Sequence, residues 1–451
     1  MHVLGIDIGS SSVKCAVLRG STVPGGIVHA RFSSQIDGVR VEVAPDALLK
    51  AVHAAVKDAG SGAKSADVLA LSVMSPAWVA MDAKGRALTP FVTHQDRRSV
   101  EVARELEQKV GKERYLALAG NRPFPGGISA TTWAWYLRNE PARLRKADLA
   151  GHLNTFLLRQ FTGARVIDPA NASFTGLYST PDQGGWKDEL CEAVGAKRSQ
   201  LPEVREAGEV AGRLTREAAG RLGLKAGMPV LVGIVDTSSA MLLTGAKPGQ
   251  LLNSSGSTDV LGLSTNRAAP HERLLTRALG VGRKWMSVST LAAAGSAIAW
   301  TKDQLFADLD WPAYTRLIKT LSRKAPTTGK RARGRTNQDD PAAGVRFEPF
   351  LAGDRTSIEQ SKATFTGLTL ATTRNHMLAA VLEALAHASA ARLGLLKKAN
   401  KIPLRHEVVV TGGAGELTSL FHRDWPGKWS FRSEKEATLR GLACLEPRER
   451  S

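Results

Sequence analysis

The chain has 451 residues, 43% of them hydrophobic and 23% charged, a composition typical of a globular protein with two or three domains. Its three cysteines, Cys15, Cys191 and Cys444, lie far apart and form no CxxC pair, which argues against a disulfide framework or a zinc site. The sequence shows no signal pattern and no run of 18 apolar residues, so we expect a cytoplasmic protein without a membrane span.

The formal net charge is +19 at pH 7, and its densest focus is residues 322–338, with six Lys or Arg and no acidic residue. Such a charge is compatible with nucleic-acid binding. However, no aromatic residues interleave with the basic ones, and no zinc finger or RNA-binding motif is present. We therefore predict a flexible basic loop rather than a nucleic-acid site. A cationic surface also attracts anionic substrates such as nucleotides.

The opening of the chain alternates strands and helices. Residues 3–7, 13–18 and 26–32 are short β-like runs separated by turns. Apolar spacing of three and four predicts a helix over 46–60, and an apolar strand follows at 67–75. This alternation indicates a sheet with helices packed on its faces, the α/β class.

The second half of the chain repeats the pattern of strands and Gly-rich turns seen at its start. The run 228–236 is an apolar strand that ends on a carboxylate, 250–263 is a strand, a Gly-Ser turn and a strand, and 407–420 is a strand, a Gly-rich turn and a helix start. This organisation predicts two domains, residues 1–228 and 229–451.

Asp7 stands at the end of the first predicted strand and is followed by Gly9, Ser10, Ser11 and Ser12. A Gly-Ser turn presents backbone N–H groups and hydroxyls that suit phosphate oxygens. A carboxylate beside it suits Mg²⁺, usually through water. The alternative is an ordinary hairpin turn, where Gly and Ser are common.

Three residues in the second half form a similar turn, Gly256, Ser257 and Thr258. Two such turns, one in each half, are suited to gripping one polyphosphate. The Gly412–Gly413 pair follows a strand but matches neither a GxGxxG nor a P-loop motif. It fits close approach to a flat group such as a purine, or merely a tight turn.

Asp236 ends the most apolar predicted strand. A carboxylate there can act as a general base for a hydroxyl or hold a metal. It can also cap a helix that begins at Thr237, and the two roles are compatible.

Several sequence motifs, spread over nearly the whole chain, follow one another in the order seen in one known protein family. They include GIDIGSSSVK at 5–14, VAMDAKGRALTPFVTHQDRRS at 79–99, GIVDTSSAMLLTGAKPG at 233–249, FEPFLAGDRTS at 347–357 and the tail VVVTGGAGELTSL from residue 408. Together they resemble the FGGY family of carbohydrate kinases, in the actin, Hsp70 and hexokinase superfamily. The resemblance implies two ribonuclease H-like domains of the actin-like ATPase type, with an ATP and sugar cleft between them.

The resemblance also implies an activity and roles. The protein would be an ATP-dependent kinase that phosphorylates a hydroxyl of a small sugar, with Asp236 as catalytic base and Asp7 positioning Mg²⁺. The residues implied to bind ATP are Gly9, Ser10, Ser11, Ser12, Lys14, Gly256, Ser257, Thr258, Gly412 and Gly413. Those implied to face the sugar are Ser75, His94, Asp96 and Arg98.

The sugar pocket departs from the family pattern. Xylulose kinases of the family usually have a Gln-Met-His element where this chain has MSPAW at 74–78, a Trp where His94 stands, and an Asn where Thr237 stands. A ketose such as xylulose is our prediction, with rhamnulose, gluconate and glycerol as alternatives. The rival from another class is a non-catalytic ATP-binding regulatory protein, but retention of both Asp7 and Asp236 argues against it. A homodimer is compatible with the sequence.

Overall fold

The computed structural model describes residues 1–324, 340–359, 361–413 and 418–449. Most of the basic segment 322–338 lies outside these residues. The chain forms two compact units, one of Met1–Gln250, Ser264–Ser287 and Glu436–Ser451, the other of Leu251–Leu263 and Val288–Lys435. The boundary that we predict at 228/229 falls inside the first unit, and the C-terminal segment returns to that unit.

The main sheet of the first unit has the strand order β12-β13-β6-β1-β2-β3, and β14 also pairs with β6. β1 is antiparallel to β2 and parallel to β6. The strands are β1 (His2–Ile8), β2 (Ser12–Arg19), β3 (Val28–Arg31), β6 (Val68–Val73), β12 (Val210–Arg213), β13 (Pro229–Leu231) and β14 (Ile234–Val235). Every residue of β6 is buried, which explains why the sequence shows an unbroken apolar run there.

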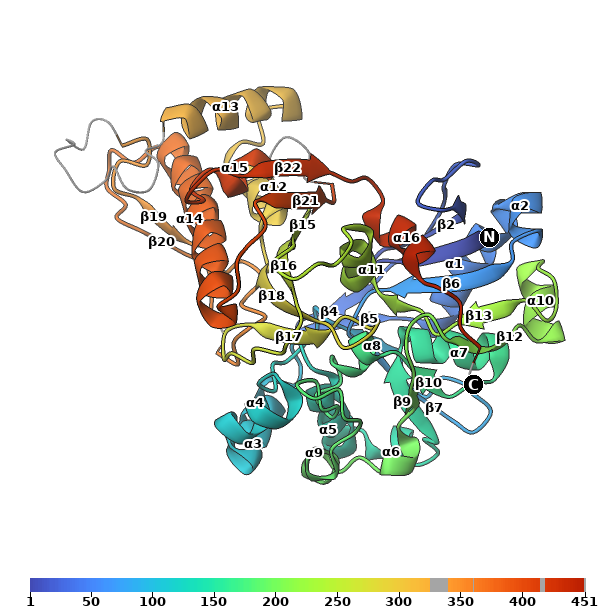
Figure 1. Ribbon diagram of the computed structural model, residues 1–451. Coiled ribbons are helices and arrows are strands. Elements are labelled where there is room, and N and C mark those ends of the chain that lie inside the picture. The colour runs from blue at the N-terminus through green and yellow to red at the C-terminus, as the bar shows by residue number, and fades with distance from the viewer. Residues whose placement is uncertain (325–339, 360, 414–417, 450–451) are drawn as a thin grey trace. The chain divides into compact units, whose positions relative to one another are not determined.

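Helices cover both faces of this sheet (Figure 1). α1 (Pro45–Asp58), α7 (Leu153–Thr162) and α10 (Arg216–Leu222) share one hydrophobic core with the β1 side chains of Leu4 and Ile6. α16 (Ala437–Arg440) and the 3₁₀ turn Gly441–Cys444 pack with Val3 in a second core. Because side chains alternate along a strand, these two cores lie on opposite faces of β1.

A smaller sheet in the first unit has the order β4-β5-β8-β7-β9. Its strands are β4 (Gln35–Asp37), β5 (Arg40–Val43), β7 (Ala77–Met81), β8 (Phe91–Thr93) and β9 (Leu149–His152). The other elements are α2 (Gly60–Lys64), α3 (Val100–Val110), α4 (Lys112–Ala119), α5 (Ser129–Asn139), α6 (Pro141–Leu144), β10 (Val166–Ile167), α8 (Pro169–Ala172), α9 (Asp188–Val194), the 3₁₀ turn Arg198–Gln200, β11 (Glu203–Val204), α11 (Asp236–Leu243) and β17 (Leu275–Ala278).

The sheet of the second unit places its strands in the order β18-β16-β15-β21-β22. They are β15 (Leu251–Ser255), β16 (Asp259–Thr265), β18 (Trp285–Leu291), β21 (Glu407–Thr411) and β22 (Ser430–Ser433). The other elements are α12 (Gly295–Leu305), α13 (Trp311–Lys324), β19 (Arg346–Glu348), β20 (Thr364–Thr366), α14 (Arg374–Asn400) and α15 (Thr418–His422).

α14 is the core helix of the second unit (Figure 1). By length and composition alone it could cross a membrane, but 56% of its most apolar window is buried inside the structure. Leu378 and Leu382 of α14 share a hydrophobic core with Ile298 of α12 and Tyr314 of α13. The helix is therefore accounted for by packing within its own unit.

The α/β class predicted from the alternating pattern is confirmed, and most predicted elements agree with the structure to within a few residues. One predicted element is wrong in detail. The strand predicted over 228–236 is two short strands, β13 and β14, separated at Gly233. Gly233 has a φ of 79°, and a Cβ there would lie 2.7 Å from the Leu71 carbonyl oxygen, so this break needs glycine.

Candidate functional site

The first Gly-Ser turn is a tight connection between β1 and β2. The Gly9 N–H donates to the Ser12 carbonyl oxygen at 3.0 Å, and the side chains of Ser10 and Ser11 are exposed. The turn therefore has the hairpin geometry that we gave as one interpretation. Its exposed hydroxyls leave it compatible with the other, a phosphate site.

Asp7 is buried at the end of β1, with 5% of its surface exposed. Ser72 Oγ donates to Oδ1 at 2.7 Å, and Thr438 Oγ1 donates to Oδ2 at 2.6 Å. Burial raises the pKa of the Asp7 carboxyl, and the two hydroxyl donors offset part of that rise. Each oxygen keeps a further lone pair, so the carboxylate can still accept a hydrogen bond from metal-bound water.

Lys14 lies opposite Asp7 in the β1–β2 register. Its Nζ forms an ion pair with Glu436 Oε2 at 2.5 Å. The sequence prediction of a phosphate contact for Lys14 did not include this acidic partner, which comes from the other end of the chain.

Asp236 is the first residue of α11 and is half-buried. Its Oδ1 accepts a hydrogen bond from the Thr237 N–H at 2.5 Å. The helix-cap position is Val235, which makes no side-chain cap, so the predicted capping role is not the one the structure shows. Asp236 does lie in the first helical turn, where a negative charge is favoured by the helix dipole.

Strand register brings Asp236 to the same edge as the first turn. Val73 at the end of β6 pairs in parallel both with Ile8 of β1 and with Val235 of β14. The residues that follow these three strands are the Gly-Ser turn, Met74–Ser75 and Asp236. The carboxyl edge of parallel strands is where α/β proteins bind their ligands.

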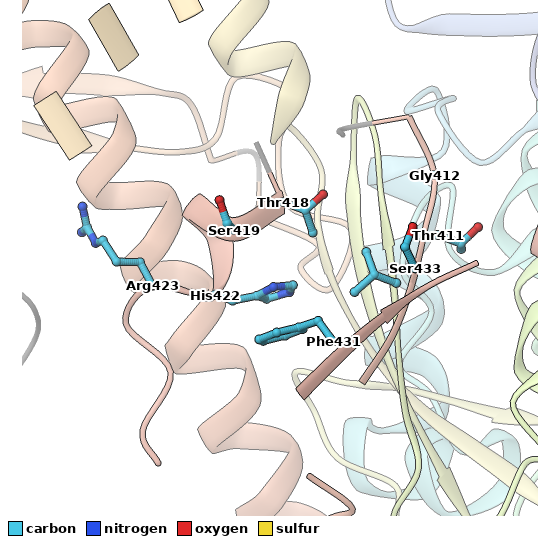
Figure 2. Close-up of a pocket in the computed structure, with 9 residues that line it drawn as sticks. Thr411, Gly412, Thr418, Ser419, His422, Arg423, Phe431 and Ser433 are labelled. Carbon is cyan, nitrogen blue, oxygen red and sulfur yellow. The ribbon is translucent and has the colours of Figure 1, made fainter. Parts of the chain in front are cut away.

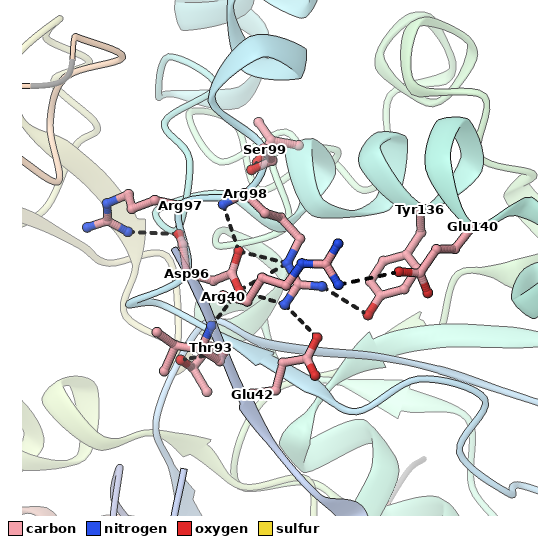
Figure 3. Close-up of polar contacts among 11 residues, drawn as sticks. Arg40, Glu42, Thr93, Asp96, Arg97, Arg98, Ser99, Tyr136 and Glu140 are labelled. Atoms are coloured by element: carbon pink, nitrogen blue, oxygen red, sulfur yellow. Dashed lines mark hydrogen bonds and ion pairs between the residues drawn. The ribbon is translucent and has the colours of Figure 1, made fainter. Parts of the chain in front are cut away.

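The side chains of Asp96 and Arg98 lie side by side and bind mainly each other (Figure 3). The Arg98 guanidinium donates to both Asp96 carboxylate oxygens and, at 2.5 Å, to Glu42 Oε1. Each side chain of the Asp96–Arg98 pair is 2% exposed. The Val41 N–H also donates to Asp96 Oδ2, at 2.8 Å. This arrangement stabilises the loop, and direct contact of either residue with a sugar stays a prediction.

His94 and Ser75 are both half-buried. The His94 carbonyl oxygen accepts a hydrogen bond from Arg97 in the loop before Arg98. Ser75 lies two residues beyond Val73, the last residue of β6, and its Oγ donates to Asn171 Oδ1 at 2.8 Å.

The second Gly-Ser turn, in the other unit, is held by backbone contacts. The Gly256 N–H donates to the Thr258 carbonyl oxygen at 2.8 Å, and the Gly295 N–H donates to the Gly256 oxygen at 3.1 Å. A Cβ on Gly295 would lie 2.4 Å from that oxygen, so Gly295 also shapes the turn. Gly295 is not among the predicted site residues, and its sequence signal is the run of small residues at 292–297.

Gly412 packs against the same strand end as this turn. Its φ is 100°, and a Cβ there would lie 2.2 Å from the Ser255 carbonyl oxygen. Gly412 therefore needs to be glycine because of this contact with protein backbone, and close approach of the Gly412–Gly413 pair to a purine stays a prediction. Residues 414–417, the rest of the glycine cluster, lie outside the described residues.

Gly412 also borders a cavity of about 350 Å³ between β21, α15 and β22 (Figure 2). His422 and Phe431 stack in it with ring centroids 4.3 Å apart and planes 9° from parallel. His422 Nε2 lies 2.8 Å from Asn253 Oδ1. An exposed aromatic face of this kind suits a flat ring, so the cavity is compatible with the predicted adenosine site.

The buried position of His422 predicts acid sensitivity. Burial lowers the pKa of His422 to about 4. In the unfolded chain a histidine titrates near 6.5, so below that pH the unfolded state binds a proton that the folded state does not. The contribution of neutral, buried His422 to the free energy of unfolding is therefore complete above pH 6.5 and is lost as the pH falls toward 4. Between pH 7 and pH 5 the free energy of unfolding should fall by about 2 kcal/mol from this cause. Urea unfolding at pH 7 and 5 should show this loss for the wild type and a smaller one for His422→Gln. Equal losses in the two proteins would contradict the assignment.

Within the described ranges, no group of three or more His, Cys, Asp or Glu residues could hold a metal ion.

The N-terminal domain model of the FGGY family of carbohydrate kinases matches residues 2–243, and the C-terminal domain model matches residues 251–421. Xylulose kinase of Escherichia coli (strain K12) is 28% identical over 407 residues, covering 86% of this chain and 77% of the relative. Glycerol kinase of Thermococcus gammatolerans is 26% identical over 463 residues, covering 98% of this chain and 88% of the relative.

Two solved structures share the fold. The structure of xylulose kinase from Rhodospirillum rubrum superposes with a TM-score of 0.83 at 23% identity, covering 99% of this chain and 88% of that one. Plasmodium falciparum glycerol kinase with ADP gives a TM-score of 0.81 at 19% identity, with the same coverage of 99% and 88%.

Proposed function

The chain belongs to the FGGY family of carbohydrate kinases, ATP-dependent enzymes that phosphorylate sugar hydroxyls, and from that premise we propose that its acceptor is a small ketose such as xylulose. Kinases named for xylulose stand among its relatives in both sequence and structure. Deoxyketoses such as rhamnulose, sugar acids such as gluconate, and glycerol are the alternatives.

The observation that carries the mechanism is the position of Asp236. Asp236 follows β14 at the same carboxyl edge of the sheet as the turn that follows β1, with β6 between the two strands. In our proposal Asp236 takes the proton of the sugar hydroxyl as that oxygen attacks the γ-phosphorus of ATP. Phosphoryl transfer depends mainly on placing the nucleophile and neutralising charge, so one oriented base and two phosphate-binding turns are a sufficient protein contribution.

We propose that Asp7 holds Mg²⁺ through a water molecule, and that the turns at Gly9–Ser12 and Gly256–Thr258 bind the phosphates of ATP. Mg²⁺, when bound, supplies charge neutralisation for the transferring phosphoryl group. Ser72 and Thr438 orient the Asp7 carboxylate for this role. Gly412 and Gly413 would border the adenosine.

Asp7→Asn is expected to raise the Mg²⁺ concentration that half-saturates turnover by about tenfold, because an amide is a poorer partner than a carboxylate for hydrated Mg²⁺. The KM for the sugar should stay unchanged. Binding of Mn²⁺ with ADP, measured by electron paramagnetic resonance, should weaken in parallel. Asp58→Asn, at an exposed position, is the control. Normal Mg²⁺ dependence in Asp7→Asn would remove Asp7 from the metal site.

The acceptor is tested by comparing kcat/KM for xylulose, rhamnulose, gluconate and glycerol in an ADP-release assay. We expect xylulose to give the highest value. A higher value for another member of the panel would replace the ketose assignment and leave the kinase assignment intact.

We further propose a cytoplasmic location, and we expect neither a membrane nor a nucleic acid as partner. A homodimer remains compatible with the chain. For the basic segment 322–338, neutralising Lys330, Arg331, Arg333 and Arg335 should leave sugar turnover nearly unchanged.

A further inference from the structure

The C-terminal part of the chain returns to the main sheet through residues 436–441, which we call the return segment. The return segment includes the short helix α16 and belongs to the same compact unit as β1, β14 and α11. Its Leu439 shares a hydrophobic core with Val3 of β1 and Val235 of β14. The return segment is therefore packed on the two strands that lead to the carboxylates of the proposed site.

One residue of the return segment contacts both parts of that site. Thr438 Oγ1 donates to Asp7 Oδ2 at 2.6 Å, and the Thr438 carbonyl oxygen accepts a hydrogen bond from Ser239 Oγ, also at 2.6 Å. Ser239 lies on α11, the helix whose first residue is Asp236. A chain of two hydrogen bonds thus joins the Asp7 carboxylate to the helix that carries the proposed base.

The contact between α11 and the return segment is close-packed (Figure 1). Ser239 is 0% exposed. A Cβ on Gly441 would lie 1.9 Å from the Ser239 carbonyl oxygen and 2.7 Å from Ser239 Oγ, so only glycine allows this approach. Because the Ser239 hydroxyl is shielded from water, its hydrogen bond to Thr438 is stronger than the same bond at the surface.

A second side chain of the return segment reaches the same edge of the sheet. Glu436 Oε2 pairs with Lys14 Nζ at 2.5 Å, and Lys14 lies directly opposite Asp7 in the β1–β2 register. Glu436 has a φ of 53°, in the left-handed region that favours glycine. The surrounding structure imposes this strained backbone. The return segment is thus fixed at its start by Lys14 and at its end by α11.

Phosphoryl transfer requires the base and the metal to stand in a fixed relation, because the attacking oxygen and the transferred phosphorus must be aligned. A displacement of about 1 Å can cost roughly 10²-fold in rate. Asp7 lies on β1, Asp236 follows β14, and β6 separates the two strands. The link through Ser239 and Thr438 spans this separation on the helical face of the sheet.

We propose that Ser239 and Thr438 are positioning residues that jointly set the base Asp236 relative to the metal carboxylate Asp7. This inference rests on the proposed function and deepens it, because it makes the placement of one catalytic carboxylate depend on the other. The two hydrogen bonds act in series. Breaking either one therefore releases the same constraint.

A double-mutant cycle tests the series arrangement. Full-length Ser239→Ala, Thr438→Val and the double variant are compared at saturating Mg²⁺ and ATP, with the sugar that gives the wild type its highest kcat/KM. We expect each single change to lower kcat about tenfold, as a small misplacement of the base would. The double variant should also lose about tenfold, because coupled changes are not additive. A loss of about 100-fold, the product of two independent effects, would overturn the inference.

Metal binding provides a readout that does not depend on turnover. Ser239 makes no hydrogen bond to Asp7 itself, since its hydroxyl donates to the Thr438 carbonyl oxygen. Ser239→Ala should nevertheless weaken binding of Mn²⁺ with ADP about fivefold, measured by electron paramagnetic resonance, because it loosens the residue that holds Asp7. Thr438→Ser, which keeps the hydroxyl, should bind Mn²⁺ nearly as the wild type does. Unchanged Mn²⁺ binding in Ser239→Ala would overturn the coupling.

The matched controls are Ser179→Ala and Thr162→Val. Ser179 is 0% exposed and bonds to Asp182, and half-buried Thr162 donates to the Leu158 carbonyl oxygen at 2.8 Å. Both controls should keep the wild-type kcat and Mn²⁺ affinity. Thermal melting checks the fold of every variant. If Ser239→Ala does not fold, Ser239→Cys, a weaker hydrogen-bond donor, takes its place in both experiments.

The outcomes separate this inference from the proposed function. A wild type that phosphorylates a sugar, with Ser239→Ala and Thr438→Val behaving like the two controls, would overturn the inference and leave the proposed function standing. A wild type that phosphorylates no sugar of the panel would overturn both.

Discussion

Asp236→Asn is expected to lower kcat by about 10³-fold, within the range that general-base catalysis contributes. Asparagine has nearly the same shape as aspartate, and its side-chain oxygen can still accept the Thr237 N–H that Oδ1 accepts now. The variant should therefore fold and bind ATP as the wild type does, and lose only the group that takes the hydroxyl proton. An ADP-release assay with saturating sugar measures the loss, and calorimetry measures ATP binding.

The control for this variant is Asp46→Asn, because Asp46 is also an acidic residue in the first turn of a helix, on α1. Its kcat should equal that of the wild type. Unchanged turnover in Asp236→Asn would exclude Asp236 as the base, whereas a loss of ATP binding would point to a role in the nucleotide site instead.

Asp259→Ala is expected to lower the free energy of unfolding by about 3–5 kcal/mol, because it leaves a buried arginine without its counter-ion. Asp259 is 0% and Arg392 is 8% exposed, and they form an ion pair through Asp259 Oδ2. Arg392 also donates to the Asp259 backbone oxygen at 3.0 Å, and Asn253 donates to Oδ1 at 2.8 Å. Since Asp259 follows Thr258, the same change should loosen the second phosphate turn.

Guanidinium unfolding of the full chain measures this effect. Asp308→Ala removes the acid of an ion pair with Arg374 whose side chains are 55% and 47% exposed, so its midpoint should stay close to that of the wild type. The double variant Asp259→Ala/Arg392→Met should recover much of the lost stability, because it leaves no charge buried. Wild-type stability in Asp259→Ala alone would contradict a buried, structural ion pair.

The elements of the fold that depend on local pattern could be predicted from the sequence. The helix predicted over 46–60 is α1, and the strand predicted over 67–75 is β6. In both cases the apolar pattern of neighbouring residues shows what is buried: one face of the helix, and the whole of the strand. The break in the strand predicted at 228–236 could not be predicted, because Gly233 is required by its distance from Leu71, which is remote in sequence.

The candidate site was predictable only in part, for the same reason. Asp7, Asp236 and the glycine turns have local signals. Their partners do not: Thr438 reaches Asp7 across 431 positions, and Glu436 reaches Lys14 across 422. The predicted sugar-facing Arg98 is enclosed by Asp96 and Glu42, which only the three-dimensional packing could reveal.

In our proposal this chain transfers phosphate from ATP to a sugar through Asp236. This transfer is tested most directly by ³¹P nuclear magnetic resonance of the wild-type protein with Mg²⁺, ATP and D-xylulose, with Asp236→Asn as the blank. We expect a sugar phosphate ester signal that grows as the γ-phosphorus signal of ATP declines, and no such signal with the variant. A protein that binds ATP but forms no phosphate ester with xylulose, rhamnulose, gluconate or glycerol would contradict it.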